Sequence, residues 1–554
     1  MLKPTLDWWR GATLYQVYPR SFADSHGDAG WDGVGDLPGV TAHLPYIASL
    51  GVDGLWLSPV FTSPMRDFGY DVADHRDIDP MFGTLADFDA LIQRAHALGL
   101  KVIIDQVWSH TAIEHAWFQV SRASRDSAQA DWYVWADAKP DGGTPNNWLS
   151  WMGGPAWTWE PRRKQYYFHN FLPQMPDLNF HCPAVQDAVL DLARFWLARG
   201  VDGFRLDTAN LYFHSRGLEN NPPAAQPADM PVLMQRHAHN TDQPETLPFL
   251  ERLRAVMDEY GASFSVGEIG GAEPLKTMTE YTAGRSRLHS AYSFAMLGDR
   301  PRPADIARQM ADWQQGAAAE AWPSWAFSNH DVPRVASRWG GLTSGGFAFG
   351  RAAEGAAAQP GAPAQLWLAL LAVLRGTLFI YQGEELGLPQ AEVAFEDLQD
   401  PFGRANWPTH KGRDGCRTPM PWLAEAPQLG FSEGRPWLPV DAAHRALAVD
   451  LQNADPDSCL TLTRRLIALR RAHPALRLGA FETLRADERV LQLRREFEGD
   501  VVVAAFNLSG SPASAELPEG LLVSADAVQV GDITALGASL RLGAWSALIQ
   551  ALPR

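Results

Sequence analysis

The sequence predicts an α/β protein built on a (β/α)8 TIM barrel, with a subdomain inserted after the third strand and an antiparallel β domain near the C-terminus. Two observations lead to this prediction. Short apolar, β-branched runs alternate with helical patterns over most of the 554 residues, which is typical of a parallel sheet. There are eight such runs, the number of strands that closes a (β/α)8 barrel.

The eight predicted strands lie, in chain order, at residues 14–17, 54–57, 102–105, 203–206, 264–267, 290–293, 325–328 and 378–381. Helical patterns between them include residues 85–98, 185–199, 249–260 and 364–374. Near-continuous apolar strands separated by helices bury both faces of a sheet, as the strands of a barrel do.

Two stretches break this alternation. The connection between the third and fourth strands, residues 109–179, is rich in aromatic residues, Gly and Pro, and it is too long for a plain loop. From about residue 478, three strand-like runs at 490–494, 501–506 and 544–549 are separated by turn residues. We therefore predict a barrel at 1–108 and 180–477 (domain A), an inserted subdomain at 109–179 (domain B) and a β domain at 478–554 (domain C).

The composition excludes several classes of partner. There are 47 Lys and Arg against 64 Asp and Glu, a net charge of −17, which argues against nucleic acid and anionic membranes. Three cysteines make a poor disulfide framework, and no apolar run is long enough to span a bilayer. We expect a cytoplasmic monomer or homodimer that acts on a small molecule. The 22 Trp residues weakly favour a carbohydrate, since large cores also use Trp.

The most informative run is Gly-Phe-Arg-Leu-Asp-Thr at 203–208. Strand side chains alternate between faces, so Arg205 and Asp207 point the same way. A neighbouring cation lowers the pKa of a carboxyl group and keeps it ionised, which suits a nucleophile. Taken alone, the pair fits a structural ion pair at a strand end equally well.

Other strand ends carry polar side chains too, and barrel enzymes place their catalytic residues at these ends. Glycoside cleavage with retention needs an ionised nucleophile and a protonated acid about 5 to 5.5 Å apart. Asp207 fits the first role, and Glu268, with no cation adjacent in sequence, fits the second because burial would raise its pKa. Asp331 would bind sugar hydroxyls and favour a distorted ring, with His110 and His330 as further donors. No motif supports a transition-metal site.

These residues and their order resemble the α-amylase family, glycoside hydrolase family 13, and within it the α-glucosidase and oligo-1,6-glucosidase branch. The matching segments cover nearly the whole chain: 54–59, 67–71, 105–110, 175–179, 203–207, Glu268, 329–331 and 383–387. The resemblance implies that Asp207 is the nucleophile, Glu268 the acid and then base, and Asp331 the stabiliser of the transition state.

The same resemblance implies the substrate-binding residues. Tyr70 would stack under the sugar, and its hydroxyls would be held by Asp67, His110, Arg205 and His330. Phe171 falls where the family carries an aromatic wall. Arg413 matches an arginine that reaches the non-reducing end, and an Asp–Arg pair there would favour removing one glucose from a chain end.

One loop departs from the family pattern. Related enzymes hold Ca2+ or Mg2+ in a compact Asp-x-Asn-x-Asp loop, whereas here the candidate ligands are spread out: Asp24, His26, Asp28, Val34 and Asp36. Clustered carboxylates suit a hard cation, but His is a poor Ca2+ ligand. We predict a structural Ca2+ or Mg2+ and no cofactor for catalysis. The alternative is an Asp/Gly-rich turn without an ion.

The sequence therefore predicts a retaining, exo-acting α-glucosidase acting on short oligosaccharides and glucosides, with transglucosylation. Thr208 resembles α-1,4-preferring members of the branch, in which Val at this position accompanies α-1,6 preference. One alternative is a transglucosylase or trehalose-forming isomerase on the same scaffold. Another, of a different class, is a non-catalytic barrel scaffold; the three carboxylates argue against it.

Overall fold

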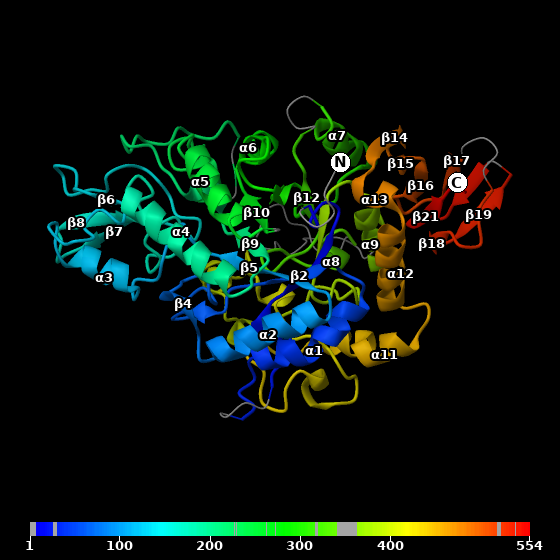
Figure 1. The fold of residues 1–554 in the computed structure, drawn as a ribbon, viewed down its shortest axis with the longest axis horizontal. Coiled ribbons are helices and arrows are strands. Elements are labelled where there is room, and N and C mark those ends of the chain that lie inside the picture. Colours follow the sequence, from blue (N-terminus) through cyan, green and yellow to red (C-terminus); the bar gives the residue numbers. More distant parts are fainter. Residues whose placement is uncertain are drawn as a thin grey trace. The chain divides into compact units, whose positions relative to one another are not determined.

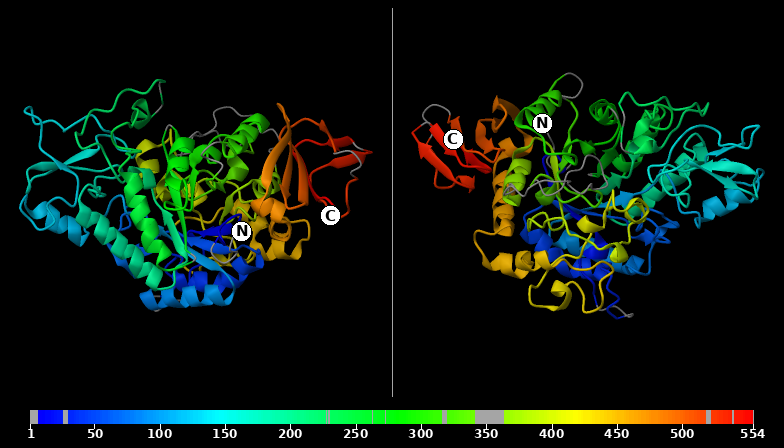
Figure 2. Two further views of the ribbon diagram at one scale, coloured as in Figure 1. Left: turned by 45° about the horizontal axis from the view of Figure 1, so that its top comes forward. Right: turned by 180° about the vertical axis from the view of Figure 1, so that it is seen from behind.

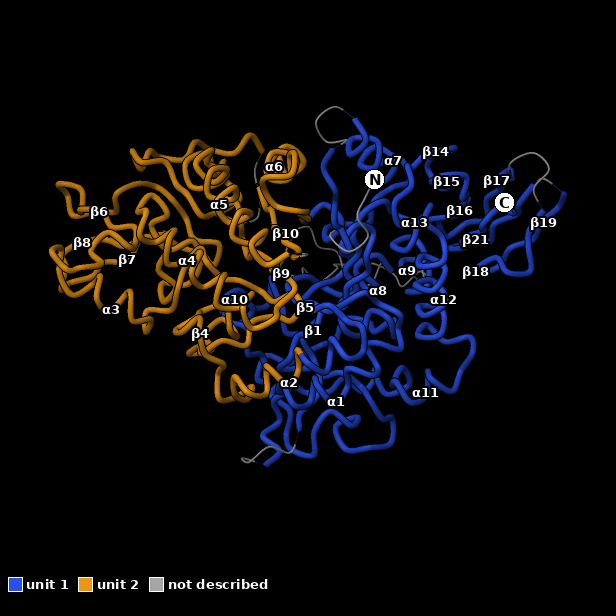
Figure 3. Tube along the Cα trace, in the orientation of Figure 1, with its two compact units in different colours: residues 1–56, 93–101, 294–554 blue, residues 57–92, 102–293 orange. Residues whose placement is uncertain are grey.

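The computed structural model describes residues 7–25, 30–226, 228, 230–261, 263–271, 273–315, 320–340, 363–517, 522–537 and 539–553. The chain forms two compact units, shown in two colours in Figure 3. Unit 1 comprises residues 1–56, 93–101 and 294–554, and unit 2 comprises residues 57–92 and 102–293.

Eight strands form one sheet in the order β11-β10-β9-β5-β2-β1-β13-β12. Figure 1 labels five of them, β2, β5, β9, β10 and β12. They are β1 (Thr13–Val17), β2 (Gly54–Leu57), β5 (Lys101–Gln106), β9 (Gly203–Leu206), β10 (Phe264–Ile269), β11 (Ser290–Ser293), β12 (Ser324–Ala326) and β13 (Thr377–Tyr381). The pairs β5–β9, β9–β10, β10–β11, β12–β13 and β1–β13 are parallel. All eight predicted strands are present, and the (β/α)8 fold class is confirmed.

Helices separate these strands along the chain. They are α1 (Leu37–Ser49), α2 (Leu85–Ala97), α3 (Ala116–Ala123), α4 (Pro183–Ala198), α5 (Thr246–Asp258), α6 (Pro274–Thr282), α7 (Pro303–Asp312), α8 (Val335–Arg338) and α9 (Ala364–Val373), followed by α10 (Pro401–Asn406), α11 (Val449–Ala454), α12 (Cys459–Ala472) and α13 (Pro474–Leu478). In unit 2, α4 packs against α5, and α6 contacts β10 and β11. The buried face of α4 follows a helical spacing, with Val185, Val189, Leu192 and Trp196 turned inward.

A small antiparallel sheet lies between β5 and β9 along the chain, as predicted for an insertion after the third barrel strand. It has the order β6-β8-β7, with β6 (Trp135–Ala136), β7 (Trp157–Glu160) and β8 (Gln165–Phe168). Trp148 and Trp157 form its core together with Phe168. Two of the tryptophans that suggested a carbohydrate are thus core residues, and only Trp159 is strongly exposed, at 42%, among the described Trp residues of this segment.

In unit 1, the C-terminal strands form two antiparallel sheets, β14-β15-β16-β21-β18 and β17-β20-β19. Their bounds are β14 (Ala480–Ala486), β15 (Val490–Phe497), β16 (Asp500–Asn507), β17 (Ala513–Glu516), β18 (Val528–Val530), β19 (Ile533–Leu536), β20 (Ser539–Leu542) and β21 (Ser546–Ala551). β15 and β16 pack on α13, and β21 packs on α9; Figure 2 shows these strands from two further sides. A last pair, β3 (Phe61–Thr62) and β4 (Asp74–Ile78), lies in unit 2.

The predicted β domain is present, although the sequence indicated only three of its strands. β14 and β19 expose most of their residues, so their apolar alternation is weak. The predicted domain boundaries at 109, 180 and 478 stay predictions. No helix in the described part of the chain is both long and apolar enough to cross a membrane.

Candidate active site

The ends of β5, β9, β10 and β11 carry a cluster of buried charged and polar side chains, which we call the Arg205 cluster: Asp105, Arg205, Asp207, Glu268 and Tyr292. Strand register brings them together, because Asp105 pairs with Arg205 and Glu268 pairs with Tyr292. Residues paired across parallel strands point to the same face.

Arg205 is fully buried and donates from every nitrogen of its guanidinium group. Nη1 lies 2.7 Å from Asp105 Oδ1 and 2.7 Å from Asp207 Oδ1. Nη2 lies 2.5 Å from Glu268 Oε1. Nε and Nη2 donate to the phenol oxygen of Tyr292 at 3.1 and 3.0 Å. The predicted approach of Arg205 to Asp207 on one face is therefore present.

Glu268 was predicted to be an acid without a neighbouring cation, but the structure places an arginine beside it. No cation neighbours it in the chain, but strand pairing brings the Arg205 guanidinium to its Oε1. Tyr292 donates to the same oxygen at 3.0 Å, and the backbone N–H of Thr208 donates to Oε2 at 3.3 Å. Burial, which favours the protonated form, is thus opposed by a cation and two hydrogen-bond donors that favour the ionised form.

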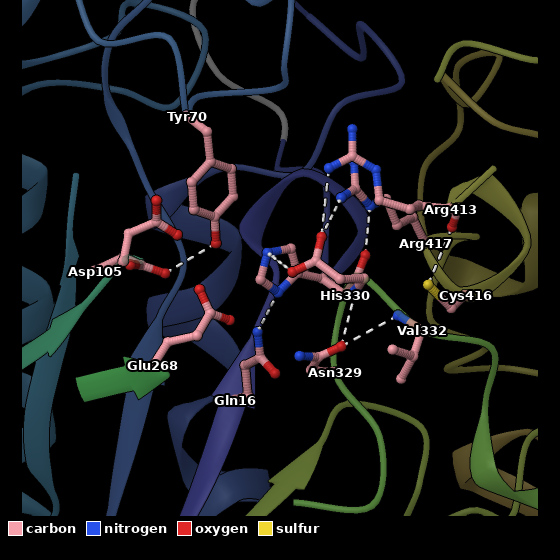
Figure 4. A network of polar contacts seen from close by, with 12 residues as sticks. Gln16, Tyr70, Asp105, Glu268, Asn329, His330, Val332, Arg413, Cys416 and Arg417 are labelled. Carbon is pink, nitrogen blue, oxygen red and sulfur yellow. Dashed lines mark hydrogen bonds and ion pairs between the residues drawn. The ribbon is translucent and has the colours of Figure 1, made fainter. Parts of the chain in front are cut away.

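Tyr70 is connected to this cluster through Asp105. Tyr70 donates its hydroxyl to Asp105 Oδ2 at 2.9 Å, the contact drawn in Figure 4. Burial raises the pKa of Asp105 to about 6, even though the Arg205 charge acts to lower it. Asp105 was part of a matched motif but was not a predicted site residue.

His110 is held as a neutral ring beside the predicted aromatic wall. Burial lowers its pKa to about 4. Its Nε2 donates to the carbonyl of Tyr70 at 3.0 Å, so Nδ1 is the acceptor facing Ser109 Oγ at 2.8 Å. The Phe171 ring lies 5.2 Å from the imidazole, measured between ring centroids. The structure thus brings Tyr70, His110 and Phe171 together.

Asp67 lies in a tight loop that Asp71 organises. The carboxylate of Asp71 accepts from the backbone N–H groups of Asp67, at 3.0 Å, and Arg66, at 2.8 Å, and from the hydroxyl of Ser63, at 2.9 Å. Phe68 adopts φ 53° within this loop. These contacts fix the backbone between Asp67 and Tyr70.

Thr208 has a left-handed backbone, with φ 40° and ψ 48°. Its hydroxyl lies 3.3 Å from Asp207 Oδ2 and 3.1 Å from Ser109 Oγ. With its N–H on Glu268, this one residue contacts both proposed reacting carboxylates.

Unit 1 holds a second group, which we call the Asp331 cluster: His330, Asp331, Asp400, Arg413 and Arg417. His330 and Asp331 follow β12, Asp400 precedes α10, and the two arginines lie on the segment after α10. Asp331 Oδ1 lies 3.1 Å from Arg417 Nη2 and 3.4 Å from Arg413 Nη1. His330 Nε2 lies 3.2 Å from Asp331 Oδ2, and His330 Nδ1 lies 2.9 Å from Gln16 Nε2 (Figure 4). An amide N–H donates, so Nδ1 is the acceptor and Nε2 carries the hydrogen that faces Asp331.

Arg413 is held mainly by a residue that the sequence did not single out. Asp400, fully buried, accepts from Arg413 Nη2 at 2.9 Å, from Nε at 3.2 Å and from its backbone N–H at 2.7 Å. Although burial acts to raise the pKa of Asp400, the charges of Arg413 and Arg417 bring it below its usual value. The bidentate pair fixes the arginine that the resemblance assigns to substrate.

The predicted cation loop is described only in part, because His26 and Asp28 lie outside the described residues. Asp24 Oδ2 accepts from Gly33 N at 3.0 Å and from Ser432 Oγ at 2.5 Å. Asp36 caps α1 through Gly39 N at 2.7 Å. The described residues contain no group of three His, Cys, Asp or Glu side chains that could hold a metal ion. The cation stays a prediction.

Sequence reasoning missed Tyr292, Asp400 and Arg417. Tyr292 lies on a correctly predicted strand, and a parallel register with Glu268 would have revealed it. Asp400 and Arg417 lie on loops whose path the local sequence pattern does not encode.

The chain matches the family described as alpha amylase, catalytic domain, over residues 16–479. A protein of Rhizobium meliloti (strain 1021) named "Probable alpha-glucosidase" is 52% identical over 528 residues, which cover 94% of this chain and 92% of the relative. The oligo-1,6-glucosidase of Heyndrickxia coagulans is 34% identical over 548 residues, covering 93% of this chain and 94% of the relative.

A solved structure is similar over the same extent. The crystal structure of the α-glucosyl transfer enzyme XgtA has a TM-score of 0.89 and 51% identity, covering 98% of this chain and 99% of that one. The barrel, its carboxylate clusters and these relatives define a glycoside hydrolase. The chain belongs to the α-amylase family.

Proposed function

We propose that this enzyme is a retaining, exo-acting α-glucosidase that hydrolyses terminal α-glucosidic bonds of short oligosaccharides and glucosides. Asp207 Oδ2 or Oδ1 attacks the anomeric carbon while Glu268 gives its proton to the leaving oxygen, which forms a β-glucosyl ester and releases the aglycone. Glu268 then takes a proton from water, which attacks the same carbon and releases α-glucose and free Asp207.

The observation that carries this proposal is the Arg205 guanidinium, which contacts both Asp207 and Glu268. A cation at 2.7 Å favours the ionised carboxylate that a nucleophile requires. The same guanidinium thus links the two carboxyl groups, and the separation of about 5 to 5.5 Å that retention requires is part of this proposal.

We assign the remaining roles by the resemblance. Asp331 stabilises the oxocarbenium-like transition state, and its contacts with two arginines favour its charged form. Asp67, Tyr70, His110, Phe171, Arg205, His330 and Arg413 would bind the terminal glucose. An arginine at the non-reducing end closes the site to longer chains on that side and makes the enzyme exo-acting.

A second candidate is transfer of the glucosyl group to another sugar or alcohol in place of water. The similarity to an α-glucosyl transfer enzyme favours it. Both reactions pass through the same covalent intermediate and differ only in the acceptor. Product analysis at high maltose concentration separates them. It also detects the third candidate, a trehalose-forming isomerase, in which the sugar just released accepts the glucosyl group through a different hydroxyl.

The central test replaces the two carboxylates. Asp207→Asn removes the nucleophile and Glu268→Gln the acid, so each should lower kcat about 10³-fold or more with the circular dichroism spectrum unchanged. Proton NMR of the first glucose released from maltose should show the α-anomer. Near-normal activity in either variant, or initial β-glucose, would refute the assignment.

We further propose a cytoplasmic enzyme, monomeric or homodimeric, that needs no cofactor for catalysis and carries a structural Ca2+ or Mg2+ in the loop before α1. Scarce cysteine supports the location. Fractionation of cells and light scattering of the pure protein would test the location and the oligomeric state.

A further inference from the structure

Tyr292 contacts both Arg205 and the proposed acid, Glu268. It is 1% exposed, on β11, and strand register sets it beside Glu268 on β10. Its phenol oxygen is 3.0 Å from Glu268 Oε1 and within 3.1 Å of both Nε and Nη2 of Arg205. Nothing in the resemblance assigns it a role.

The contacts of Arg205 fix the direction of the phenol hydrogen. Nε and Nη2 have only hydrogens to give, so the phenol oxygen accepts from both. A phenol oxygen has two lone pairs, and both are then used. Its own hydrogen must therefore be donated, and Glu268 Oε1 receives it.

The contacts within the cluster account for all the hydrogen-bond donors of the Arg205 guanidinium. A guanidinium has five N–H groups. Two on Nη1 face Asp105 and Asp207, two on Nη2 face Glu268 and Tyr292, and the one on Nε faces Tyr292. Every member of the Arg205 cluster is thus held by the others, and the Tyr292 hydroxyl has one orientation.

Charged groups face Glu268 from two neighbouring strands of this unit, Arg205 on β9 and Asp105 on β5. The uncharged Tyr292 faces it from β11. Burial raises the pKa of Tyr292 well above its usual value, with the carboxylates adding to the effect, although the Arg205 charge acts to lower it. The phenol therefore stays a neutral donor at neutral pH.

We propose that Tyr292 is a positioning residue for Glu268, whose hydroxyl orients the carboxyl group through Oε1 and sets the pH at which that group releases its proton. This inference rests on the proposed function. A donor on Oε1 stabilises the ionised carboxylate, so Tyr292 opposes burial and lets Glu268 alternate between acid and base in the two half-reactions.

The test is the pH dependence of kcat/KM with maltose, in which the alkaline limb reports loss of the proton from the acid. Tyr292→Phe removes the donor and should move this limb to higher pH by ~1 unit. A 3-fluorotyrosine placed at position 292 keeps the oxygen for Arg205 but donates more strongly, and it should move the limb to lower pH. If Tyr292 only filled space, the two substitutions would not shift the pH of the alkaline limb in opposite directions.

Leaving-group dependence gives a second readout. A 4-nitrophenyl glucoside needs little proton donation, whereas maltose needs it fully. Tyr292→Phe should therefore lower the plateau kcat/KM for maltose more than for the aryl glucoside, and an equal loss with both substrates contradicts the inference.

The matched control is Tyr133→Phe, which removes another buried phenol, one hydrogen-bonded to Thr111 at 2.7 Å. Its alkaline limb should stay in place. This inference fails, and the proposed function stands, if Glu268→Gln is inactive while neither Tyr292 substitution moves the alkaline limb. It also fails if Tyr292→Phe moves that limb to lower pH. If Glu268→Gln stays active, the proposed function fails first.

Discussion

Thr208 adopts a backbone conformation that costs a β-branched residue about 1–3 kcal/mol. Its φ of 40° is positive, and only Gly adopts such angles readily. The contacts that hold it there are with the reacting groups: its N–H donates to Glu268, and its hydroxyl lies 3.3 Å from Asp207. The strain is therefore stored where it positions the two carboxylates.

We predict that Thr208→Val shifts linkage preference towards α-1,6 bonds. Val keeps the branched shape and the N–H contact with Glu268, and it loses only the hydroxyl. The ratio of kcat/KM for isomaltose over maltose should rise about 10-fold, the effect of one polar contact near the leaving sugar. The wild-type enzyme should prefer maltose.

Thr282→Val is the matched control, because it removes a buried threonine hydroxyl that donates to the carbonyl of Met278 within α6. Its linkage ratio should equal that of the wild type. A wild-type preference for isomaltose, or an unchanged ratio in Thr208→Val, would contradict the role of this position.

At the scale of elements, the eight barrel strands were predictable because buried parallel strands are continuous apolar runs. The i to i+2 spacing within one strand also predicted that Arg205 and Asp207 would lie on the same face, as they do. The contact of Arg205 with Glu268 was not predictable, because it depends on the register between β9 and β10. Contacts across strands follow from pairing, which a single strand sequence does not contain.

The loop before α1 contains three aspartates whose charges predict an effect of divalent cations on stability. Burial raises the pKa values of Asp24 and Asp36, and the charge of Asp32 raises both further. Asp32 was not a predicted ligand. A divalent cation would relieve this repulsion, and oxygen ligands are what Ca2+ and Mg2+ prefer. We therefore expect a chelator to lower Tm and millimolar Ca2+ or Mg2+ to restore it.

The stabilisation should be about 2–3 kcal/mol when the cation is at a hundredfold excess over its dissociation constant. In Asp32→Asn the difference in Tm between chelator and cation should shrink, whereas Asp126→Asn, at an exposed aspartate, should keep it. Identical melting curves with chelator and with either cation would show that the loop is a turn without an ion.

At the scale of the whole chain, the C-terminal strands are structurally tied to a helix of the barrel region within unit 1. Arg495 on β15 is fully buried and donates to the carbonyls of Val373, Gly479 and Ala480, the first of which lies 122 residues earlier in the chain. Arg470 on α12 donates to Ala372 and Leu374. Two arginines thus satisfy the carbonyl groups at the end of α9, which a helix leaves without partners.

We therefore predict that Arg495→Met lowers the free energy of unfolding by about 3 kcal/mol or more, because methionine fills the space but no longer donates to the carbonyl groups of Val373, Gly479 and Ala480. Thermal denaturation followed by circular dichroism should show Tm lower by several degrees. Arg494→Met on the same strand removes only half-exposed ion pairs with Glu482 and Glu496, and it should change Tm little. Equal Tm values for the two variants would contradict this prediction, because they would mean that the C-terminal sheet does not stabilise α9. The buried contacts of Arg495 instead predict that this sheet stabilises the end of α9.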